Sequence, residues 1–172
     1  DSSCLGGAGN VGYNLEALGA VPLLVGVVGR DDPGRWIRKK APVRQGIFTD
    51  AKRPTTVKTR IIAHHQQVVR VDRETRRKIT PGTIKRIIDR MKDAVPGVDA
   101  VLFSDYDKGV VGAGLVGALR EAAPQATMFA DPKGADLERY RGVDLVSPNL
   151  EEVEPATGMP VAGSTSSRLG LT

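Results

Sequence analysis

The chain has 172 residues, of which 40% are hydrophobic, and it carries a formal net charge of +5. This length and apolar content suffice for one compact domain with a real core and leave little room for a second. The one cysteine, Cys4, excludes a disulfide framework and favours a reducing, cytoplasmic setting, and no Cys/His group has the spacing of a zinc site. No apolar run approaches the roughly 20 residues needed to span a bilayer, so we expect a soluble protein.

Basic residues are densest between residues 70 and 92, RVDRETRRKITPGTIKRIIDRMK. Clustered Lys and Arg bind nucleic acids by releasing counterions from phosphates. However, Ile84, Ile87, Ile88 and Met91 follow i, i+3, i+4, i+7 spacing, which predicts an amphipathic helix with its charges in water. No aromatic residue interleaves with the basic run, so the stacking platforms of single-strand binders are missing. We predict no nucleic-acid partner, and the same positive charge suits a phosphorylated small substrate.

A glycine-rich stretch, LGGAGNVG, spans residues 5–12. Gly7, Gly9 and Gly12 satisfy G-x-G-x-x-G, the dinucleotide fingerprint. That fingerprint requires a strand directly before the glycines, and the preceding residues, DSSC, predict none. A Rossmann-type NAD-binding domain is therefore the weaker interpretation.

The residues after these glycines predict a short helix over 11–18 with Gly19 just past its end. A glycine-rich turn that opens a helix brings backbone N–H groups close to the oxygens of a ligand. Asn10 lies at the expected helix entrance, where it would be either a polar contact for that ligand or a helix cap.

Residues 21–28, VPLLVGVV, are apolar and β-branched, which predicts a buried parallel strand. Residues 33–40 predict a helix opened by proline, and the pattern over residues 40–44 is unreliable. Residues 55–72 alternate and are β-branched, which predicts extended strands, with a hairpin turn near residues 64–67.

The expected hairpin would project Lys58 and Arg60 from one face, because they are two residues apart. Such a flap could carry cations toward a phosphate-bearing substrate, although an exposed strand face explains the same charges. His64 and His65 are adjacent and would point to opposite faces of a strand, so we predict no metal site there.

The second half of the chain alternates apolar runs with helical patterns. The alternation predicts a parallel α/β sheet with right-handed crossovers. The expected elements are a strand at 98–103, a crossover helix at 109–122, a strand at 127–130, a helical turn at 137–140 and a strand at 143–147.

Polar residues follow three of these strands: Asp105, Asp131 and Asn149. In a parallel sheet, ligands collect in the crevice beyond the carboxyl ends of the strands, so these side chains predict one site. Ordinary turn chemistry also explains Asp131-Pro132 and the Ser147-Pro148 pair.

Six blocks of sequence, in this order, carry a resemblance to a known family: LGGAGNVGYNLEALGA, VVGRDD, PTTVKTRIIAHHQQVVRVDRE, FSDYDKGVV, DPKGADLERYRG and SPNLEE. Together they cover about residues 5–158, and they resemble the kinase domain of D-glycero-β-D-manno-heptose-7-phosphate kinases. These enzymes are ribokinase-like (PfkB) carbohydrate kinases that are often fused to an adenylyltransferase domain. DPKG followed by ERYRG and PNLxE is specific to this branch, whereas the glycine block indicates only the superfamily.

The resemblance implies a three-layer parallel sheet flanked by helices, with a small β-lid over residues 55–74 that closes over the sugar and often joins two subunits as a homodimer. It also implies transfer of the γ-phosphoryl group of ATP to O1 of heptose 7-phosphate, a cytoplasmic step toward ADP-heptose for lipopolysaccharide. Another PfkB-family sugar kinase remains the nearest alternative.

The resemblance also implies site residues. Gly6, Gly7 and Asn10 match the sugar-contacting glycine block. The N-x-x-E motif, associated with magnesium and nucleotide phosphates, is matched by Asn149, Leu150, Glu151 and Glu152. A carboxylate such as Glu152 can hold Mg²⁺ through water.

Position and charge, without a firm family role, make four cations candidates for phosphate contacts, and the two aspartates at the strand ends complete the expected substrate side of the crevice. The cations are Lys58, Arg60, Lys108 and Lys133, and the aspartates are Asp105 and Asp131.

Two parts of the family pattern are missing from these residues. No strand with a G-D motif precedes the glycine block, and no G-A-G-D motif, which carries the catalytic aspartate, occurs in the 172 residues. Residues 159–172 form a polar tail without a further strand. We therefore expect a partial kinase domain over 1–172, a fragment or a truncated relative, with no catalytic residue of its own and no turnover alone.

Overall fold

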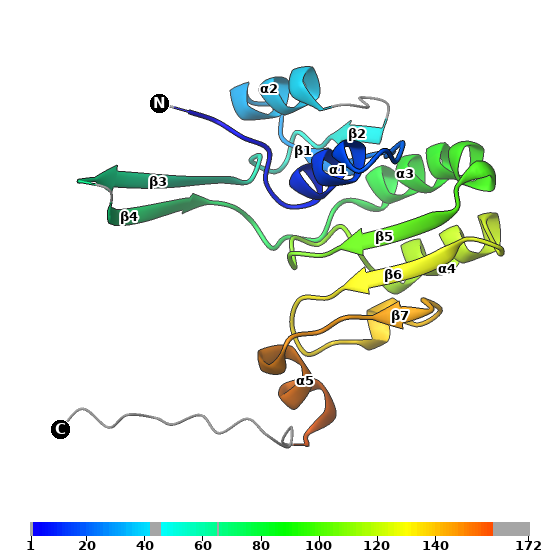
Figure 1. Ribbon diagram of the computed structural model, residues 1–172. Coiled ribbons are helices and arrows are strands. Elements are labelled where there is room, and N and C mark those ends of the chain that lie inside the picture. The colour runs from blue at the N-terminus through cyan, green and yellow to red at the C-terminus, as the bar shows by residue number, and fades with distance from the viewer. Residues whose placement is uncertain (1, 42–45, 65, 160–172) are drawn as a thin grey trace.

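The computed structural model describes residues 2–41, 46–64 and 66–159 (Figure 1). The predictions for His65, for residues 42–44 and for the tail from residue 160 onward lie outside the described residues. The elements, in chain order, are α1 (Ala8–Ala17), β1 (Val25–Val28), α2 (Asp32–Lys40), β2 (Gly46–Thr49), β3 (Val57–Ala63), β4 (Gln66–Arg73), α3 (Pro81–Ala94), η1 (Val95–Gly97), β5 (Ala100–Ser104), α4 (Ala113–Ala122), β6 (Thr127–Asp131), η2 (Glu138–Tyr140), β7 (Leu145–Val146) and α5 (Leu150–Thr157).

The strands form three sheets: a parallel pair β1–β2, an antiparallel pair β3–β4 and a parallel sheet in the order β5-β6-β7. Helices connect the parallel strands β5 and β6 and the parallel strands β1 and β2. The predicted parallel α/β organisation and the predicted hairpin are both confirmed. Figure 1 shows the hairpin β3–β4 projecting away from the rest of the molecule.

Local sequence explains where two of the predicted helices begin. Asp31 caps α2, its side chain accepting a hydrogen bond from Gly34 N at 3.0 Å, and Thr80 caps α3 in the same way through Thr83 N at 3.3 Å. A capping oxygen satisfies a backbone donor that has no partner inside the helix. The buried residues of α3 include Ile87 and Met91, so its amphipathic prediction is confirmed.

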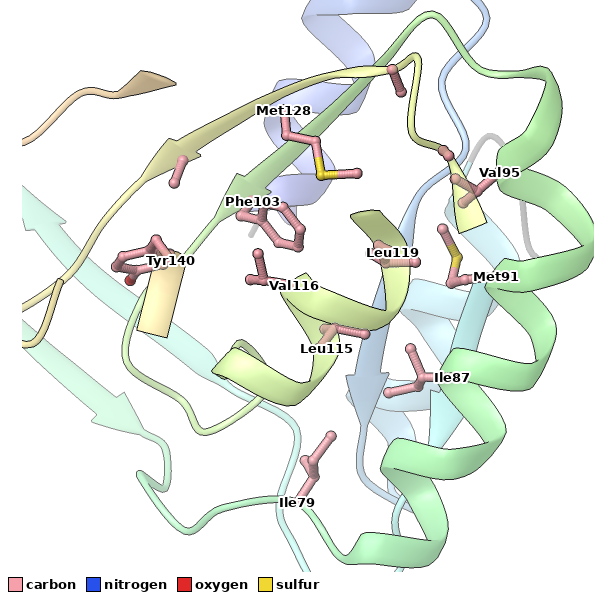
Figure 2. Close-up of a cluster of buried hydrophobic side chains, with 13 residues drawn as sticks. Ile79, Ile87, Met91, Val95, Phe103, Leu115, Val116, Leu119, Met128 and Tyr140 are labelled. Carbon is pink, nitrogen blue, oxygen red and sulfur yellow. The ribbon is translucent and has the colours of Figure 1, made fainter. Parts of the chain in front are cut away.

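The main core lies between α3 and α4 and one face of β5 and β6 (Figure 2). Ile87, Val95, Val116 and Met128 have no measurable exposure, and each fully buried aliphatic side chain stabilises the fold by about 1.5–3 kcal/mol relative to an exposed one. This core fixes β5 and β6 side by side, and with them the loops that leave their carboxyl ends.

The two parallel sheets differ in how their second face is covered. Val28 and Ile47, on β1 and β2, pack against Ile37 and Ala41 at the α2 side, while α3 contacts β2 from the main core. On β5 and β7, in contrast, Leu102 and Leu145 are exposed. Within the described residues, the predicted three-layer arrangement is therefore present at β1–β2, and the second face of β5–β7 is open.

Several predicted boundaries were wrong. Strand β1 begins at Val25, not at residue 21, because its partner β2 is only four residues long and Pro22 has no N–H to donate. Helix α4 begins at Ala113, four residues later than predicted, after Gly109 in a left-handed conformation (φ 74°) and the N-cap Gly112. Asn10 does not cap α1, since the cap is Gly7 and Asn10 lies inside the helix.

Two further differences concern the second half of the chain. Strand β7 has only two residues, shorter than the predicted 143–147, and helix α5 was not predicted as a helix. None of the helices in the described residues is long and apolar enough to cross a membrane.

Candidate functional site at the carboxyl ends of the strands

The carboxyl ends of β5 and β6 lie next to each other, as the sequence predicts. Ser104 pairs with Asp131 in the parallel register, and Asp105 N donates to the carbonyl oxygen of Asp131 at 3.0 Å. The loops after these strands therefore form the base of the predicted crevice. Asp131 is exposed there, whereas Asp105 is buried.

The Asp105 carboxylate is held by three donors from its surroundings. Its Oδ2 accepts from Tyr140 Oη at 2.6 Å and from Arg139 Nη1 at 3.3 Å, and its Oδ1 accepts from Asp107 N at 2.9 Å. Arg139 Nη1 also donates to Asp107 Oδ1 at 3.2 Å. We call these four residues, Asp105, Asp107, Arg139 and Tyr140, the Asp105 network.

Tyr140 joins this network to the loop after β6. Burial, together with the hydrogen bond to Asp105, raises the pKa of the Tyr140 hydroxyl, so it remains a donor at neutral pH. The same hydroxyl oxygen accepts from Lys133 N at 3.3 Å. Figure 2 shows Tyr140 on the short helix η2 at the edge of the core. The Tyr140 hydroxyl thus bonds to residues of both the loop after β5 and the loop after β6 and holds the two loops together.

On the far side of the crevice, Asn149 and Glu152 form a capping box that opens α5. The Asn149 side chain accepts from Glu152 N at 3.1 Å, and Glu152 Oε2 accepts from Asn149 N at 3.0 Å. Glu152 Oε1 pairs with Lys133 Nζ at 2.7 Å, and this bond lowers the pKa of the Glu152 carboxyl. The N-x-x-E pattern therefore has a helix-capping role in this structure, and its nucleotide role stays a prediction.

The base of the hairpin is joined to the loop after β5 through Glu74. Lys108 Nζ pairs with Glu74 Oε1 at 2.7 Å, and Lys58 Nζ lies 3.3 Å from Glu74 Oε2 and 2.9 Å from Asp72 Oδ2. The bond to Lys108 is the main cause of the lowered pKa of Glu74. Lys58 and Arg60 lie on one face of the hairpin, as predicted. They are two residues apart in β3, and the register with Asp72 and Arg70 is unbroken between them.

The glycine block lies against the end of β5. Gly7 has a positive φ of 53°, and a β-carbon built on it would lie 3.3 Å from the Tyr106 ring. Only glycine adopts this backbone conformation at low cost. Gly6 and Asn10 are exposed on either side of it. The structure thus brings the predicted sugar-contacting block beside the segment 105–108.

A dinucleotide site needs a strand directly before its glycines, and the described residues 2–6 contain none before Gly7. Gly9 and Gly12 lie inside α1, not in a loop that precedes it. For a metal, the described residues contain no group of three or more His, Cys, Asp or Glu placed to hold one. The role of Glu152 toward Mg²⁺ stays a prediction, since its two carboxylate oxygens here pair with Lys133 Nζ and Asn149 N.

Sequence reasoning missed four residues that shape this site: Arg53, Glu74, Arg139 and Tyr140. Tyr140 carried a usable signal, since a tyrosine that is buried usually bonds its hydroxyl to a partner, and aspartates end the neighbouring strands. Arg53 carried none, because its burial depends on where the loop after β2 meets Lys108.

The chain is similar along nearly its whole length to curated proteins. It is 41% identical over 182 residues to the bifunctional protein HldE of Pelobacter propionicus, and 39% identical over 169 residues to that of Trichlorobacter lovleyi. The alignments cover 97% and 94% of this chain but 37% and 34% of those proteins. The chain thus spans just over a third of the length of the curated relatives it matches. No family model matches the chain.

A solved structure supports the fold. A possible 1-phosphofructokinase of Thermotoga maritima matches with a TM-score of 0.58 and 22% identity, over 83% of this chain and 47% of that one. This likeness shows a shared fold of parallel strands and helices over four fifths of the chain.

Proposed function

We propose, on the premise that this chain is homologous to one region of the bifunctional HldE proteins, that it belongs to a carbohydrate kinase acting on a phosphorylated heptose. The reaction transfers the γ-phosphoryl group of ATP to O1 of D-glycero-β-D-manno-heptose 7-phosphate. It would be a cytoplasmic step toward ADP-heptose and lipopolysaccharide. The observation that carries the proposal is the identity to HldE proteins across more than nine tenths of the chain.

On the nucleotide side, residues 149–152 would contact the phosphates of ATP. Glu152 and the N–H groups that open α5 supply a carboxylate and backbone donors at one place. Magnesium, held by Glu152 through water, would neutralise charge on the phosphates. Lys133 is paired with Glu152 at 2.7 Å. When ATP binds, its ammonium group could move from Glu152 to a phosphate oxygen and pair with it instead.

On the sugar side, Gly6, Gly7 and Asn10 would contact the hydroxyl groups, and the lid over residues 55–74 would close over them. Asp131 and Lys108 border this space at the ends of β6 and β5. Asp105 would act mainly by holding the loops, because its carboxylate already accepts three hydrogen bonds. Phosphoryl transfer depends on such positioning and on charge neutralisation.

We also propose that the lid joins two copies of the chain. Directly paired residues of an antiparallel sheet share a face, so the pairs Thr59–Val71 and Ile61–Val69 lie on the face opposite Lys58. The side chains of Ile61, Val69 and Val71 are 49%, 44% and 56% exposed. Ile61→Ser should shift the mass measured by light scattering from dimer to monomer, whereas Thr59→Ser on the same face should not.

The function can be tested by placing this sequence in the matching region of the P. propionicus HldE protein and measuring ADP release. We expect release that depends on heptose 7-phosphate in the chimera and is lost in its Glu152→Ala variant. A panel of other sugar phosphates tests the alternative of another PfkB-family substrate. Sugar-independent ADP release, or a higher unfolding temperature of the 172-residue chain with NAD alone, would contradict the proposal.

A further inference from the structure

A pocket of about 350 Å³ lies at the carboxyl ends of β1 and β2, beside the base of the lid. Asp50 N donates to the carbonyl oxygen of Val28 at 2.9 Å. This hydrogen bond holds the carboxyl ends of β1 and β2 together next to the pocket. Four cations line the pocket, Arg30, Lys52, Arg53 and Arg73, against a single carboxylate. None of these cations was among the phosphate contacts expected from the sequence.

Arg53 is the buried member of this set. The residue is 7% exposed, its Nη2 donates to the carbonyl oxygen of Lys108 at 2.7 Å, and its Nη1 has no hydrogen-bond partner among the described residues. Asp50 lies near enough to act on Arg53 electrostatically, but its Oδ1 accepts from Lys52 N. A buried guanidinium donor without an acceptor is costly. Arg53 lines the pocket, so a small rotation of its side chain would offer this donor to a ligand oxygen.

The one carboxylate in the lining, Asp31, is already occupied. Its Oδ1 accepts from Gly34 N at 3.0 Å and from the Thr55 hydroxyl, and its Oδ2 accepts from Thr55 N at 3.0 Å. Arg73 Nη2 lies 3.5 Å from the same Oδ2. Arg30 and the Lys52 side chain, in contrast, have no hydrogen bond or ion pair within the part of the chain that the structure describes. Their charge is available to a ligand.

Three of the four cations predicted from the sequence have partners that these two lack; the fourth, Arg60, has no ion pair within the described residues and lies on the exposed hairpin. Lys58 and Lys108 share Glu74, and Lys133 pairs with Glu152. A neighbouring pocket of about 300 Å³ also touches Arg30, but there Arg38 donates to Thr49 and to the Ile47 carbonyl oxygen, and Arg35 pairs with Asp32. The pocket around Arg53 thus holds the most available positive charge near the strand ends.

We propose that this pocket binds a phosphate monoester dianion, and, resting on the proposed function, that it holds the phosphate which the sugar already carries. Guanidinium groups match phosphate oxygens with two parallel donors. Arg53 would connect this anion to the crevice, because it also holds the backbone of Lys108 at the end of β5. The phosphate would then anchor the sugar between the lid base and residues 105–108.

The test is a titration of the 172-residue chain with inorganic phosphate, followed by ¹H–¹⁵N NMR. We expect the largest shifts at the amides of residues 29–31 and 52–54. Arg30→Gln and Lys52→Gln, both at exposed positions, should each weaken binding by about threefold or more, and Arg53→Gln by roughly tenfold. Lys92→Gln, an equal charge change on the exposed side of α3, is the matched control and should leave the affinity unchanged.

Shifts spread over the basic surface, or an equal loss in Lys92→Gln, would overturn the site, as would the absence of saturable binding. The exposed variants decide the question if Arg53→Gln does not fold. Phosphate binding needs no ATP, so its failure is distinct from failure of the kinase proposal. An active chimera whose KM for heptose 7-phosphate is unchanged by Arg30→Gln contradicts this inference alone, whereas saturable phosphate binding without ADP release contradicts the proposed function alone.

Discussion

The Asp105 network and the hairpin β3–β4 both meet the loop after β5 but are built in opposite ways. The centre of the network is buried: the Asp105 side chain is 3% exposed and Tyr140 2%, and both have hydrogen-bond partners inside the fold. Every residue described in β4 is exposed, and β3 differs only at Val57. The hairpin segment, residues 55–74, is joined to the rest of the fold by the Glu74–Lys108 ion pair and by the bonds of Thr55 and Arg73 to Asp31.

This difference indicates how the crevice works. Satisfied hydrogen bonds in a low-dielectric interior fix their groups strongly, while exposed strands with few buried apolar contacts open at lower cost. We therefore expect the strand ends around Asp105, the floor of the predicted crevice, to be rigid, and the outer part of the hairpin β3–β4 to open locally at lower cost. The variants below would break or sharpen this contrast.

The largest effect is expected for Asp105→Ala in the floor. The substitution leaves the buried Tyr140 hydroxyl without its acceptor and removes one of the two carboxylates to which Arg139 Nη1 donates, so we expect a loss of about 3–5 kcal/mol in the free energy of unfolding, measured with urea. Glu138→Ala, which removes an exposed ion pair with Arg141, is the control and should cost less than about 1 kcal/mol. Equal losses would show that the floor is not specially stabilised.

Tyr140→Phe should have the next largest effect. It removes one hydroxyl but leaves Asp105 with its bonds to Arg139 and Asp107, so the expected loss is about 1–3 kcal/mol. Amide exchange at Lys133, whose N–H the hydroxyl accepts, should also accelerate. Unchanged exchange at Lys133 would contradict the role of Tyr140 as the link between the two loops.

Glu152→Gln tests the crevice floor through pH. Because the folded-state pKa of Glu152 lies below its ordinary value of 4.5, its contribution is complete above pH 4.5 and is lost as the pH falls through the folded pKa. The variant should therefore be less stable than the parent chain at pH 7, by about 1–2 kcal/mol, and the difference should shrink at pH 3. A difference that is constant with pH would show that the Lys133 pairing does not matter.

The smallest effect on global stability is expected for Glu74→Gln at the lid base. We expect a loss of about 1 kcal/mol in the urea experiment, because the Glu74–Lys108 pair is only partly exposed, together with faster hydrogen exchange confined to β3 and β4. Arg70→Gln, which loses an ion pair within the hairpin but not the link to the loop after β5, is the matched control. A large global loss in Glu74→Gln would mean that the lid is part of the rigid floor.

Periodicity and composition predicted the elements whose own residue pattern shows which face is buried and which is exposed. The alternating β-branched run at 55–72 gave the hairpin, and the spacing of Ile84, Ile87 and Met91 gave α3. Short strands were harder, because β2 and β7 have four and two residues and exist through pairing with β1 and β6. A pattern cannot show the length of a partner strand.

The neighbouring strand ends were predicted for a similar reason, but the hydrogen bonds that hold their loops were not. Polar residues at strand ends locate a site because parallel strands end at one edge, so Asp105 and Asp131 were expected to be neighbours. Which of them would be buried depends on Tyr140, which is 35 residues further along the chain than Asp105. Long-range bonds of this kind, like that of Arg53 to Lys108, leave no local signal.

The most direct measurement is ADP release by the HldE chimera, with heptose 7-phosphate compared with the same heptose lacking its phosphate. The account predicts magnesium-dependent release with the phosphorylated sugar, greatly reduced release with the other, and loss of both in Glu152→Ala. Equal rates with the two sugars would contradict the claim that the crevice recognises a phosphorylated substrate. Release that survives Glu152→Ala unchanged would contradict the assignment of residues 149–152 to the nucleotide.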